Sequence, residues 1–309
     1  MSVLKVENLR KSFGTVKAVE DISFSVEAGE VFTIIGPNGA GKTTTLEMIE
    51  GLQKPDAGTI SINGLNWSKD ESEIKTLIGV QPQSGALFEL LTAEENLDLF
   101  ASFYPRSKET SEVLEMINLT EHRDKRVKSL SGGQRQRLAI GLAMINDPRV
   151  IFLDEPTTGL DPQARRNIWD IIIKLKSLGT TIILTTHYME EAEKLSDRVC
   201  IVDQGQIISL DTPAALISRL TQEREVRLTF HDGEEAARLT EKAIQSQPDI
   251  VRMERDGVNL TLWSVQPEQS LYDLLGFTKE QGIRVEHVSI REMSLEDVFI
   301  AFTGKEWRD

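Results

Sequence analysis

Short apolar runs alternate with helical patterns through the middle of the chain. Residues 31–36 (VFTIIG), 149–154 (RVIFLD) and 180–187 (TTIILTTH) are nearly continuous in apolar or β-branched residues, which is typical of strands buried on both faces. We expect a helix over about 42–51, after the glycine-rich loop, and an amphipathic helix over 163–179. Because strands and helices alternate, we expect an α/β fold with a mostly parallel sheet.

Polar and apolar residues alternate at the start of the chain. Segments 4–13 (LKVENLRKSF) and 18–30 (AVEDISFSVEAGE) show this alternation and end in turn residues, which predicts antiparallel strands. Residues 59–64 (TISING) add a strand, and 198–210 (RVCIVDQGQIISL) add two more around a Gln204-Gly205 turn. We therefore expect an antiparallel β-subdomain beside the parallel sheet.

A helical insertion interrupts the strand pattern in the middle of the chain. Residues 92–104, 107–118 and 132–146 all space their apolar residues at three and four. The first of these segments opens with Thr92 and Glu95, a capping-box signal for a helix start. We place this helical subdomain at about residues 84–147.

The pattern changes again near residue 220. The segments that follow predict, in order, a strand, a helix, a hairpin that turns at Asp256-Gly257, a helix, a strand and a last helix. Their ranges are 225–230, 234–245, 249–265, 269–282, 283–292 and 294–304. The order β-α-β-β-α-β is that of a ferredoxin-like fold. We therefore expect two domains, 1–220 and a small α+β domain at 221–309.

Composition narrows the classes of function. No apolar run reaches eighteen residues, so no membrane span is predicted, and the first residues do not resemble a signal peptide. The single cysteine, Cys200, lies in an apolar strand, and we expect a core residue in a reduced, cytoplasmic compartment. The net charge of −14 argues against binding to nucleic acid. Half of that charge lies in residues 221–309, which we interpret as a solvated acidic face.

A phosphate-binding loop follows the first buried strand. GPNGAGKT fits the pattern G-x-x-x-x-G-K-[ST], in which glycines let backbone N–H groups surround a phosphate at a helix start. Lys42 can reach the β- and γ-phosphates, and the Thr43 hydroxyl can hold Mg²⁺. The nucleotide-binding residues expected here are Gly36, Pro37, Asn38, Gly39, Ala40, Gly41, Lys42, Thr43 and Thr44.

Two adjacent carboxylates end the strand at 150–154. Neighbouring side chains at a strand end point in different directions, so they can take different roles. We expect Asp154 to bind the Mg²⁺ shell and Glu155 to polarise the attacking water.

The run LSGGQ offers a second anion site. Ser131 can donate its hydroxyl, and Gly132 and Gly133 expose backbone N–H groups at a helix start, with Gln134 completing the motif. Together with the phosphate loop and VIFLDEP, this motif resembles the ATPase subunit of an ATP-binding cassette (ABC) system over about residues 2–220. In that family LSGGQ binds the nucleotide held by a different cassette.

The resemblance implies further site residues. His187 matches the family's switch histidine, which contacts the γ-phosphate, and Gln83 matches the Q-loop glutamine that touches Mg²⁺ or water, with Gln81 as the competing choice. Phe13 matches the aromatic residue that stacks on adenine, although the family more often has Tyr there. Asp161 matches the D-loop, which crosses the dimer interface. The implied catalytic set is Glu155, His187 and Gln83, and the implied metal ligands are Thr43, Gln83 and Asp154.

The end of the chain points to a transport class. SLEDVFIAFTG (294–304) resembles the C-terminal region of ATPase subunits of drug- and antibiotic-export-type transporters. The resemblance implies a peripheral subunit on the inner face of the cell membrane, with ATP and Mg²⁺ as cofactors. Its partners would be a separate permease and a second cassette, expected to be a copy of itself. The alternatives are an importer subunit and a soluble ABC ATPase that acts on nucleic acid or ribosomes.

Overall fold

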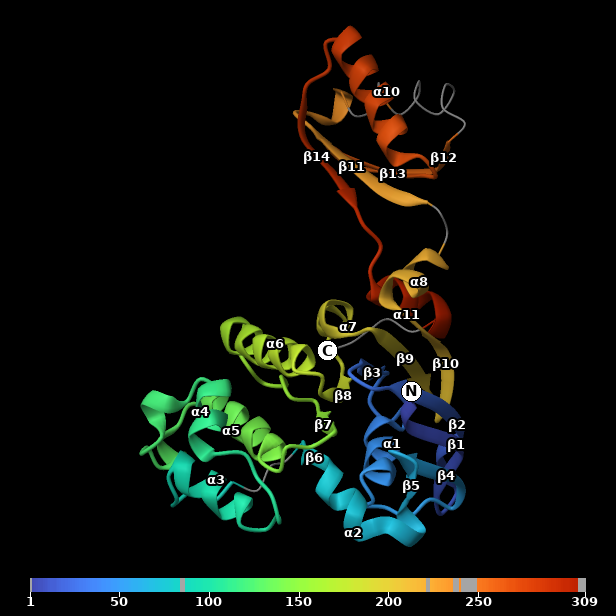
Figure 1. Cartoon of the computed structure of the whole chain (residues 1–309). Helices are drawn as coiled ribbons and strands as arrows, with labels where there is room; N and C mark the ends of the chain where they lie inside the picture. Colours follow the sequence, from blue (N-terminus) through green and yellow to red (C-terminus); the bar gives the residue numbers. More distant parts are fainter. Residues whose placement is uncertain (1, 84–86, 221–222, 236–238, 240–248, 305–309) are drawn as a thin grey trace. The chain divides into compact units, whose positions relative to one another are not determined.

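The chain divides into two compact units, whose helices and strands are labelled in Figure 1. The larger unit is Met1–Leu216 with Phe302–Asp309, and the smaller is Ile217–Ala301. A computed structural model describes residues 2–83, 87–220, 223–235, 239 and 249–304.

Six strands form the central sheet of the larger unit. In sheet order they are β10 (Gln206–Asp211), β9 (Arg198–Asp203), β3 (Val31–Ile35), β8 (Thr181–Thr186), β7 (Val150–Asp154) and β6 (Ile78–Gln81). Every neighbouring pair is parallel except β10 with β9. All residues of β3, β7 and β8 are buried, which accounts for their largely apolar sequences. The expected mostly parallel sheet is confirmed.

The expected antiparallel strands form a second sheet. Its order is β2 (Val16–Glu27), β1 (Ser2–Phe13), β4 (Ala57–Ile62) and β5 (Leu65–Asn66). The two sheets share one hydrophobic cluster, in which the rings of Phe24 and Phe32 stack with centroids 4.9 Å apart. Cys200 is fully buried in this cluster, and burial raises the pKa of its thiol to about 12. It is the core residue that the sequence predicts.

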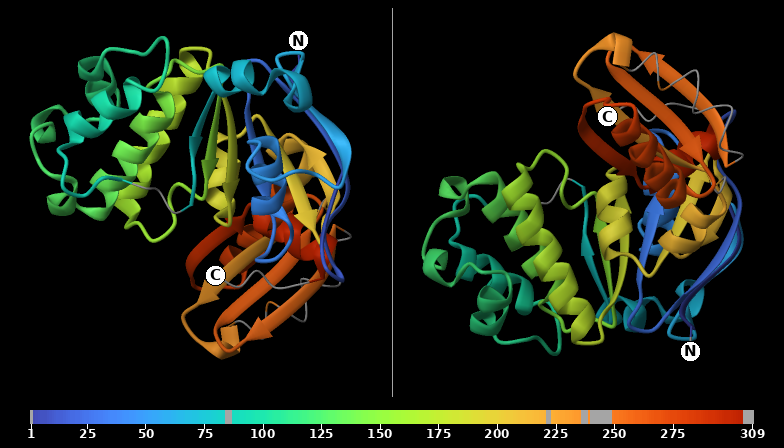
Figure 2. Two further views of the ribbon diagram at one scale, coloured as in Figure 1. Left: turned by 90° about the horizontal axis from the view of Figure 1, so that it is seen from below. Right: turned by 90° about the horizontal axis from the view of Figure 1, so that it is seen from above.

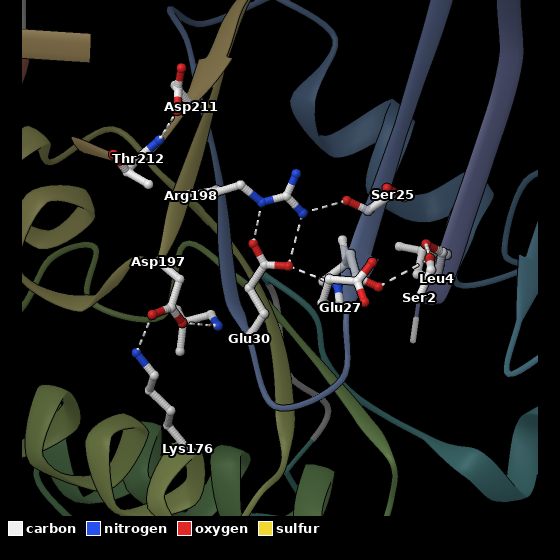
Figure 3. A network of polar contacts seen from close by, with 12 residues as sticks. Ser2, Leu4, Ser25, Glu27, Glu30, Lys176, Asp197, Arg198, Asp211 and Thr212 are labelled. Carbon is white, nitrogen blue, oxygen red and sulfur yellow. Dashed lines mark hydrogen bonds and ion pairs between the residues drawn. The ribbon is translucent and has the colours of Figure 1, made fainter. Parts of the chain in front are cut away.

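A polar network joins the two sheets at the start of β3 (Figure 3). The guanidinium of Arg198, on β9, forms a bidentate ion pair with Glu30, with N–O distances of 2.6 and 2.9 Å. The same guanidinium donates to the carbonyl of Ser25 on β2, and Glu30 accepts the backbone N–H of Glu27. A bidentate pair fixes orientation as well as distance. The turn between β2 and β3 is therefore held against β9.

Helices cover both faces of the central sheet. In the larger unit they are α1 (Lys42–Ile49), α2 (Trp67–Leu77), α3 (Ala93–Ala101), α4 (Thr110–Met116), α5 (Gly132–Met144), α6 (Pro162–Ser177), α7 (Met189–Leu195) and α8 (Pro213–Ser218, at the boundary of the units). The insertion α3–α5 shares a hydrophobic cluster with α6 and the sheet, and it forms a layer of its own in Figure 2. The predicted capping box is present, because Thr92 and Glu95 bond reciprocally. Within the described ranges, no helix could cross a bilayer.

The smaller unit is built on a four-stranded antiparallel sheet. Its order is β12 (Ile250–Asp256), β13 (Asn259–Ser264), β11 (Arg224–Phe230) and β14 (Val285–Arg291). Helix α10 (Pro267–Glu280) packs on it around a core that contains Phe230 and Leu274. The expected hairpin and the last helix, α11 (Leu295–Thr303), are present. Most of the helix expected at 234–245 lies outside the described residues.

Candidate nucleotide-binding site

The glycine-rich loop connects β3 to α1 and is packed too tightly for larger residues. A Cβ atom on Gly36 would lie 2.2 Å from the carbonyl oxygen of Val202, and one on Gly41 would lie 2.3 Å from that of Ala18. Gly41 also has a φ of 100°, which strains any L side chain. Glycine at both positions therefore lets the loop lie close against β9 and β2. The loop ends at the start of α1, and helix starts of this kind bind phosphate.

Lys42 is folded into this loop. Its side chain is buried, and Nζ donates to the carbonyls of Gly36 at 2.8 Å and Pro37 at 3.2 Å. Burial lowers the pKa of Lys42, while Glu155 and Asp154 act in the opposite direction. An ammonium group held among backbone dipoles at a helix start suits a polyphosphate.

One hydroxyl group contacts both acidic residues at the end of β7. Asp154 is buried, and burial raises the pKa of its carboxyl group. The Thr185 hydroxyl donates a short hydrogen bond to Asp154 and accepts the backbone N–H of Glu155 at 3.0 Å. No motif in the sequence identifies Thr185. The only indication is a hydroxyl residue near the end of a buried strand, which pairs with the strand of Asp154.

Glu155 is the centre of a cluster drawn from three segments. Its Oε2 accepts a hydrogen bond from Gln83 Nε2 at 3.3 Å and from the Thr158 hydroxyl at 3.0 Å. His187 Nδ1 lies 3.2 Å from the same oxygen. Gln81 is buried instead, and its Nε2 donates to the carbonyl of Pro82. Of the two candidate glutamines, Gln83 is therefore the one that reaches Glu155.

Glu155 also has an unusual backbone. Its φ is 47°, in the left-handed region that non-glycine residues rarely adopt. Its N–H bonds to both the hydroxyl and the carbonyl of Thr185 hold it there. Such strain persists only where neighbouring contacts enforce it, and it is frequent at functional sites.

The LSGGQ motif begins helix α5. Ser131 is its N-cap: its hydroxyl accepts the N–H of Gln134 at 3.2 Å, and the Gln134 side chain accepts the N–H of Ser131 at 2.9 Å. A Cβ atom on Gly132 would meet nothing within 4 Å, whereas one on Gly133 would lie 2.9 Å from Cβ of Ala164. Ser131 and Gly132 are exposed. They are thus open to a ligand from outside.

The glycine-rich loop precedes α1 and the LSGGQ motif begins α5, and these two helices lie on opposite sides of the sheet. Figures 1 and 2 show α1 on one side of β6, β7 and β8 and α5 on the other. Asp161 caps helix α6, next to α5, by accepting the N–H groups of Gln163 at 2.9 Å and Ala164 at 2.8 Å. Phe13, at the end of β1, is 48% exposed, and Lys11 Nζ lies 5.6 Å from the centroid of its ring, so it is not a core residue.

These residues fit a nucleotide with a divalent cation. The loop follows the pattern of a phosphate-binding loop, and its Gly36 and Gly41 are packed against backbone carbonyls where a Cβ atom would not fit. The carboxylate of Asp154 and the hydroxyl of Thr43 are hard oxygen ligands of the kind that Mg²⁺ prefers. Glu155 lies close enough to Lys42 and Asp154 to shift the pKa of both.

Known proteins resemble this chain over nearly its whole length. Residues 19–158 match the family model for ABC transporters. The chain is 36% identical over 312 residues to the linearmycin resistance ATP-binding protein LnrL of Bacillus subtilis, covering 99% of the chain and 100% of that protein. It is 39% identical over 315 residues to a Nod factor export ATP-binding protein I of Ralstonia nicotianae, covering 99% and 95%.

Solved structures show the same relationship. The chain resembles a dimeric ATP-binding cassette bound to ADP and phosphate in a post-hydrolysis state, with a TM-score of 0.61 and 30% identity. That match covers 68% of the chain and 98% of the cassette. A nucleotide-free cassette matches with a TM-score of 0.64 and 27% identity over 72% of the chain and 96% of that cassette. The chain therefore belongs to the ATP-binding subunits of ABC transporters, a family of ATPases.

Proposed function

We propose that this subunit hydrolyses ATP to power a separate transmembrane permease in export. The observation that carries the proposal is the convergence of Gln83, Glu155 and His187, close to Lys42 of the phosphate loop. Both named relatives, matched over nearly their full lengths, carry resistance or export in their names. Export is therefore preferred over the importer alternative.

In this proposal each residue of the site has a defined role. Lys42 and His187 contact the γ-phosphate, and Glu155 takes the proton from the attacking water. Thr43, Gln83 and Asp154 hold Mg²⁺, which when bound neutralises charge on the phosphate oxygens. Phe13 stacks on the adenine ring. The remaining loop contacts are backbone N–H groups from Gly36 to Thr44.

The site of one chain is completed by a second cassette. Ser131, Gly132, Gly133 and Gln134, with Asp161, face the nucleotide of that partner, which we propose is a copy of the same chain. The exposure of Ser131 and Gly132 supports this arrangement, and the related dimeric cassette structure supports pairing. Two ATP molecules are then shared between two chains.

An aromatic patch near α3 supports docking to the permease. Phe88 and Phe103 are 49% and 65% exposed, and both rings make edge-on contacts with Phe100, at 6.4 and 5.7 Å between centroids. Leu90 nearby in the sequence is 71% exposed. Contiguous apolar surface of this kind is typical of a protein interface. We place the permease contact here, beside the Q-loop, which holds the subunit at the inner face of the membrane.

We also propose that residues 221–309 form an accessory ferredoxin-like domain, with 1–220 as the cassette and 84–147 as its helical subdomain. The strand order β12-β13-β11-β14 has the first and third strands of the unit in the centre. This order is consistent with a β-α-β-β-α-β chain.

The hydrolytic role can be tested at His187. Replacing it in His187→Ala should leave ATP binding intact and lower hydrolysis by about 100-fold or more, because the γ-phosphate loses its contact. His231→Ala is a matched control, since His231 is exposed and pairs with Glu286 in the smaller unit. ATP binding is measured by calorimetry and hydrolysis by phosphate release. A near-normal rate for His187→Ala would remove this residue from the mechanism.

A further inference from the structure

Two side chains of helix α6 contact two side chains of the segment that follows His187. We call Arg165, Trp169, Tyr188 and Glu191 the switch cluster. The Arg165 guanidinium lies over the Tyr188 ring, 3.8 Å from its centroid. The indole N–H of Trp169 donates to Glu191 Oε1 at 2.8 Å. Both contacts pair a residue of α6 with a residue at the start of α7.

The switch cluster lies directly beside the catalytic group. The ring of Tyr188 is 4.2 Å from the ring of His187 between centroids, and His187 is 3.2 Å from Glu155. The Tyr188 backbone N–H donates to the Thr186 hydroxyl at 3.0 Å. His187 therefore lies in a turn that is followed by two residues, Tyr188 and Glu191, in contact with α6. The direction of its side chain depends on the position of this turn.

Helix α6 also contacts the LSGGQ helix. Its first turn is capped by Asp161, and Ala164 in that turn is the residue that a Cβ atom on Gly133 would strike. Arg165 is the next residue along the helix, and Trp169 follows one turn later. A single rigid helix therefore connects the turn of His187 with Gly133 and Asp161.

Packing alone does not explain Glu191. The residue is fully buried, and burial raises the pKa of its carboxyl group. The side chains of Thr186, Trp169 and Thr157 and the charge of Arg165 act on this pKa in the opposite direction. A buried carboxyl group is costly to desolvate even when it has polar partners, and an apolar side chain of similar size would fill the space at lower cost. The contact of Glu191 with Trp169 instead fixes a direction and a distance.

We propose that Arg165 and Glu191 are positioning residues, which hold the His187 turn against α6 through Tyr188 and Trp169. His187 and the amino end of α6 then move as one body. This inference rests on the proposed function, in which His187 contacts the γ-phosphate and Asp161 and Gly133 face the second cassette. Binding of the nucleotide that His187 contacts is thereby linked to the position of Asp161 and Gly133, which face the nucleotide of the second cassette.

The test compares three variants of the full chain: Trp169→Phe, Arg165→Gln and Glu191→Gln. Each should lower kcat by about 10-fold or more, because small displacements of a catalytic group are costly, while the Kd for ATP stays within about twofold. Glu190→Gln is the matched control, since Glu190 lies next to Glu191 but is exposed and pairs with Lys194. The double variant Arg165→Gln/Glu191→Gln should be no slower than the slower single variant, as expected for residues that act together.

The outcomes separate this inference from the proposed function. If wild type does not hydrolyse ATP, or His187→Ala hydrolyses it at the wild-type rate, the proposed function fails. If those two behave as expected but Trp169→Phe and Arg165→Gln keep the wild-type kcat, only the positioning role is refuted. Loss of kcat that comes with a lower Tm or weaker ATP binding also overturns it, because a merely structural role would have that signature.

Discussion

At the scale of single residues, the site depends on side chains that no motif identifies. The Thr185 hydroxyl serves Asp154 and Glu155 at once, and the left-handed backbone of Glu155 depends on the same threonine. Glu50 is a second example, because its carboxyl group is buried at the end of α1 and its Oε1 makes no hydrogen bond among the described residues. Both positions make predictions that can be measured without the permease.

Thr185→Val removes one hydroxyl with little change in shape. Asp154 and the Glu155 N–H then lose a partner in a buried site, so we expect a loss of about 1–3 kcal/mol in the free energy of unfolding. Hydrolysis should also fall, because Glu155 is no longer fixed. Urea unfolding and phosphate release measure the two effects. Thr180→Val, just before β8, is the control. Wild-type values for Thr185→Val in both assays would contradict the assigned role.

Glu50 should make stability depend on pH. Burial, followed by Asp154 and Glu47, raises its pKa from 4.5 to about 8. Between those values the folded state binds a proton that the unfolded state has released, so the free energy of unfolding falls as pH rises. Glu50→Gln should lack this component.

The free energy of unfolding can be measured in urea at about pH 5 and about pH 8. Its decrease between these pH values should be larger for wild type than for Glu50→Gln, by on the order of a few kcal/mol. Equal declines in the two proteins would show that Glu50 does not titrate in this range.

At the scale of elements, the sequence predicts those whose pattern is strong. The buried strands β3, β7 and β8 and the capped helices α3 and α5 all lie where their patterns place them. Helix α2 was not predicted, because only Ile74 of its eleven residues is buried and charged residues dominate it. Helix α7 was missed because it is one short, charged segment of seven residues.

The candidate site shows the same limit. Spacing alone predicts the phosphate loop, because its residues are contiguous and the chemistry follows from glycine and lysine. Gln83 and His187 could be assigned only through the family resemblance, since the fold alone brings them to Glu155. The switch cluster was not predicted, because Arg165 and Glu191 resemble ordinary surface charges in a helical pattern.

The two glycines of LSGGQ allow a matched test of the start of helix α5. A Cβ atom added to Gly132 would meet nothing within 4 Å. A Cβ atom added to Gly133 would lie 2.9 Å from Cβ of Ala164. Gly132→Ala should therefore fold normally, with stability unchanged or raised by up to about 1 kcal/mol, yet lose hydrolysis because the second nucleotide is obstructed. Gly133→Ala should lose stability as well, by about 1–3 kcal/mol.

Gly276→Ala on α10, where nothing lies within 4 Å, is the control for adding a methyl group to a helix. Thermal unfolding and phosphate release distinguish the variants. Wild-type hydrolysis by Gly132→Ala would mean that the exposed face of LSGGQ has no nucleotide to bind.

At the scale of the whole molecule, we propose that the chain carries two halves of different nucleotide sites. One half comprises the phosphate loop, the carboxylates and His187, and the other comprises Ser131 and Gly132, which are exposed. We therefore expect a single chain to bind ATP but to need a second cassette for turnover. The related cassette that is dimeric in its solved structure supports this expectation.

The most direct measurement is the mass of Glu155→Gln in solution. This change keeps the shape of the side chain and removes the carboxylate that takes the proton, so ATP stays bound and is not hydrolysed. Sedimentation of the variant with saturating ATP and Mg²⁺, compared with the variant without nucleotide, reports the state of assembly. We expect a dimer with ATP and a monomer without it. A monomer that has bound ATP at saturation would contradict this expectation.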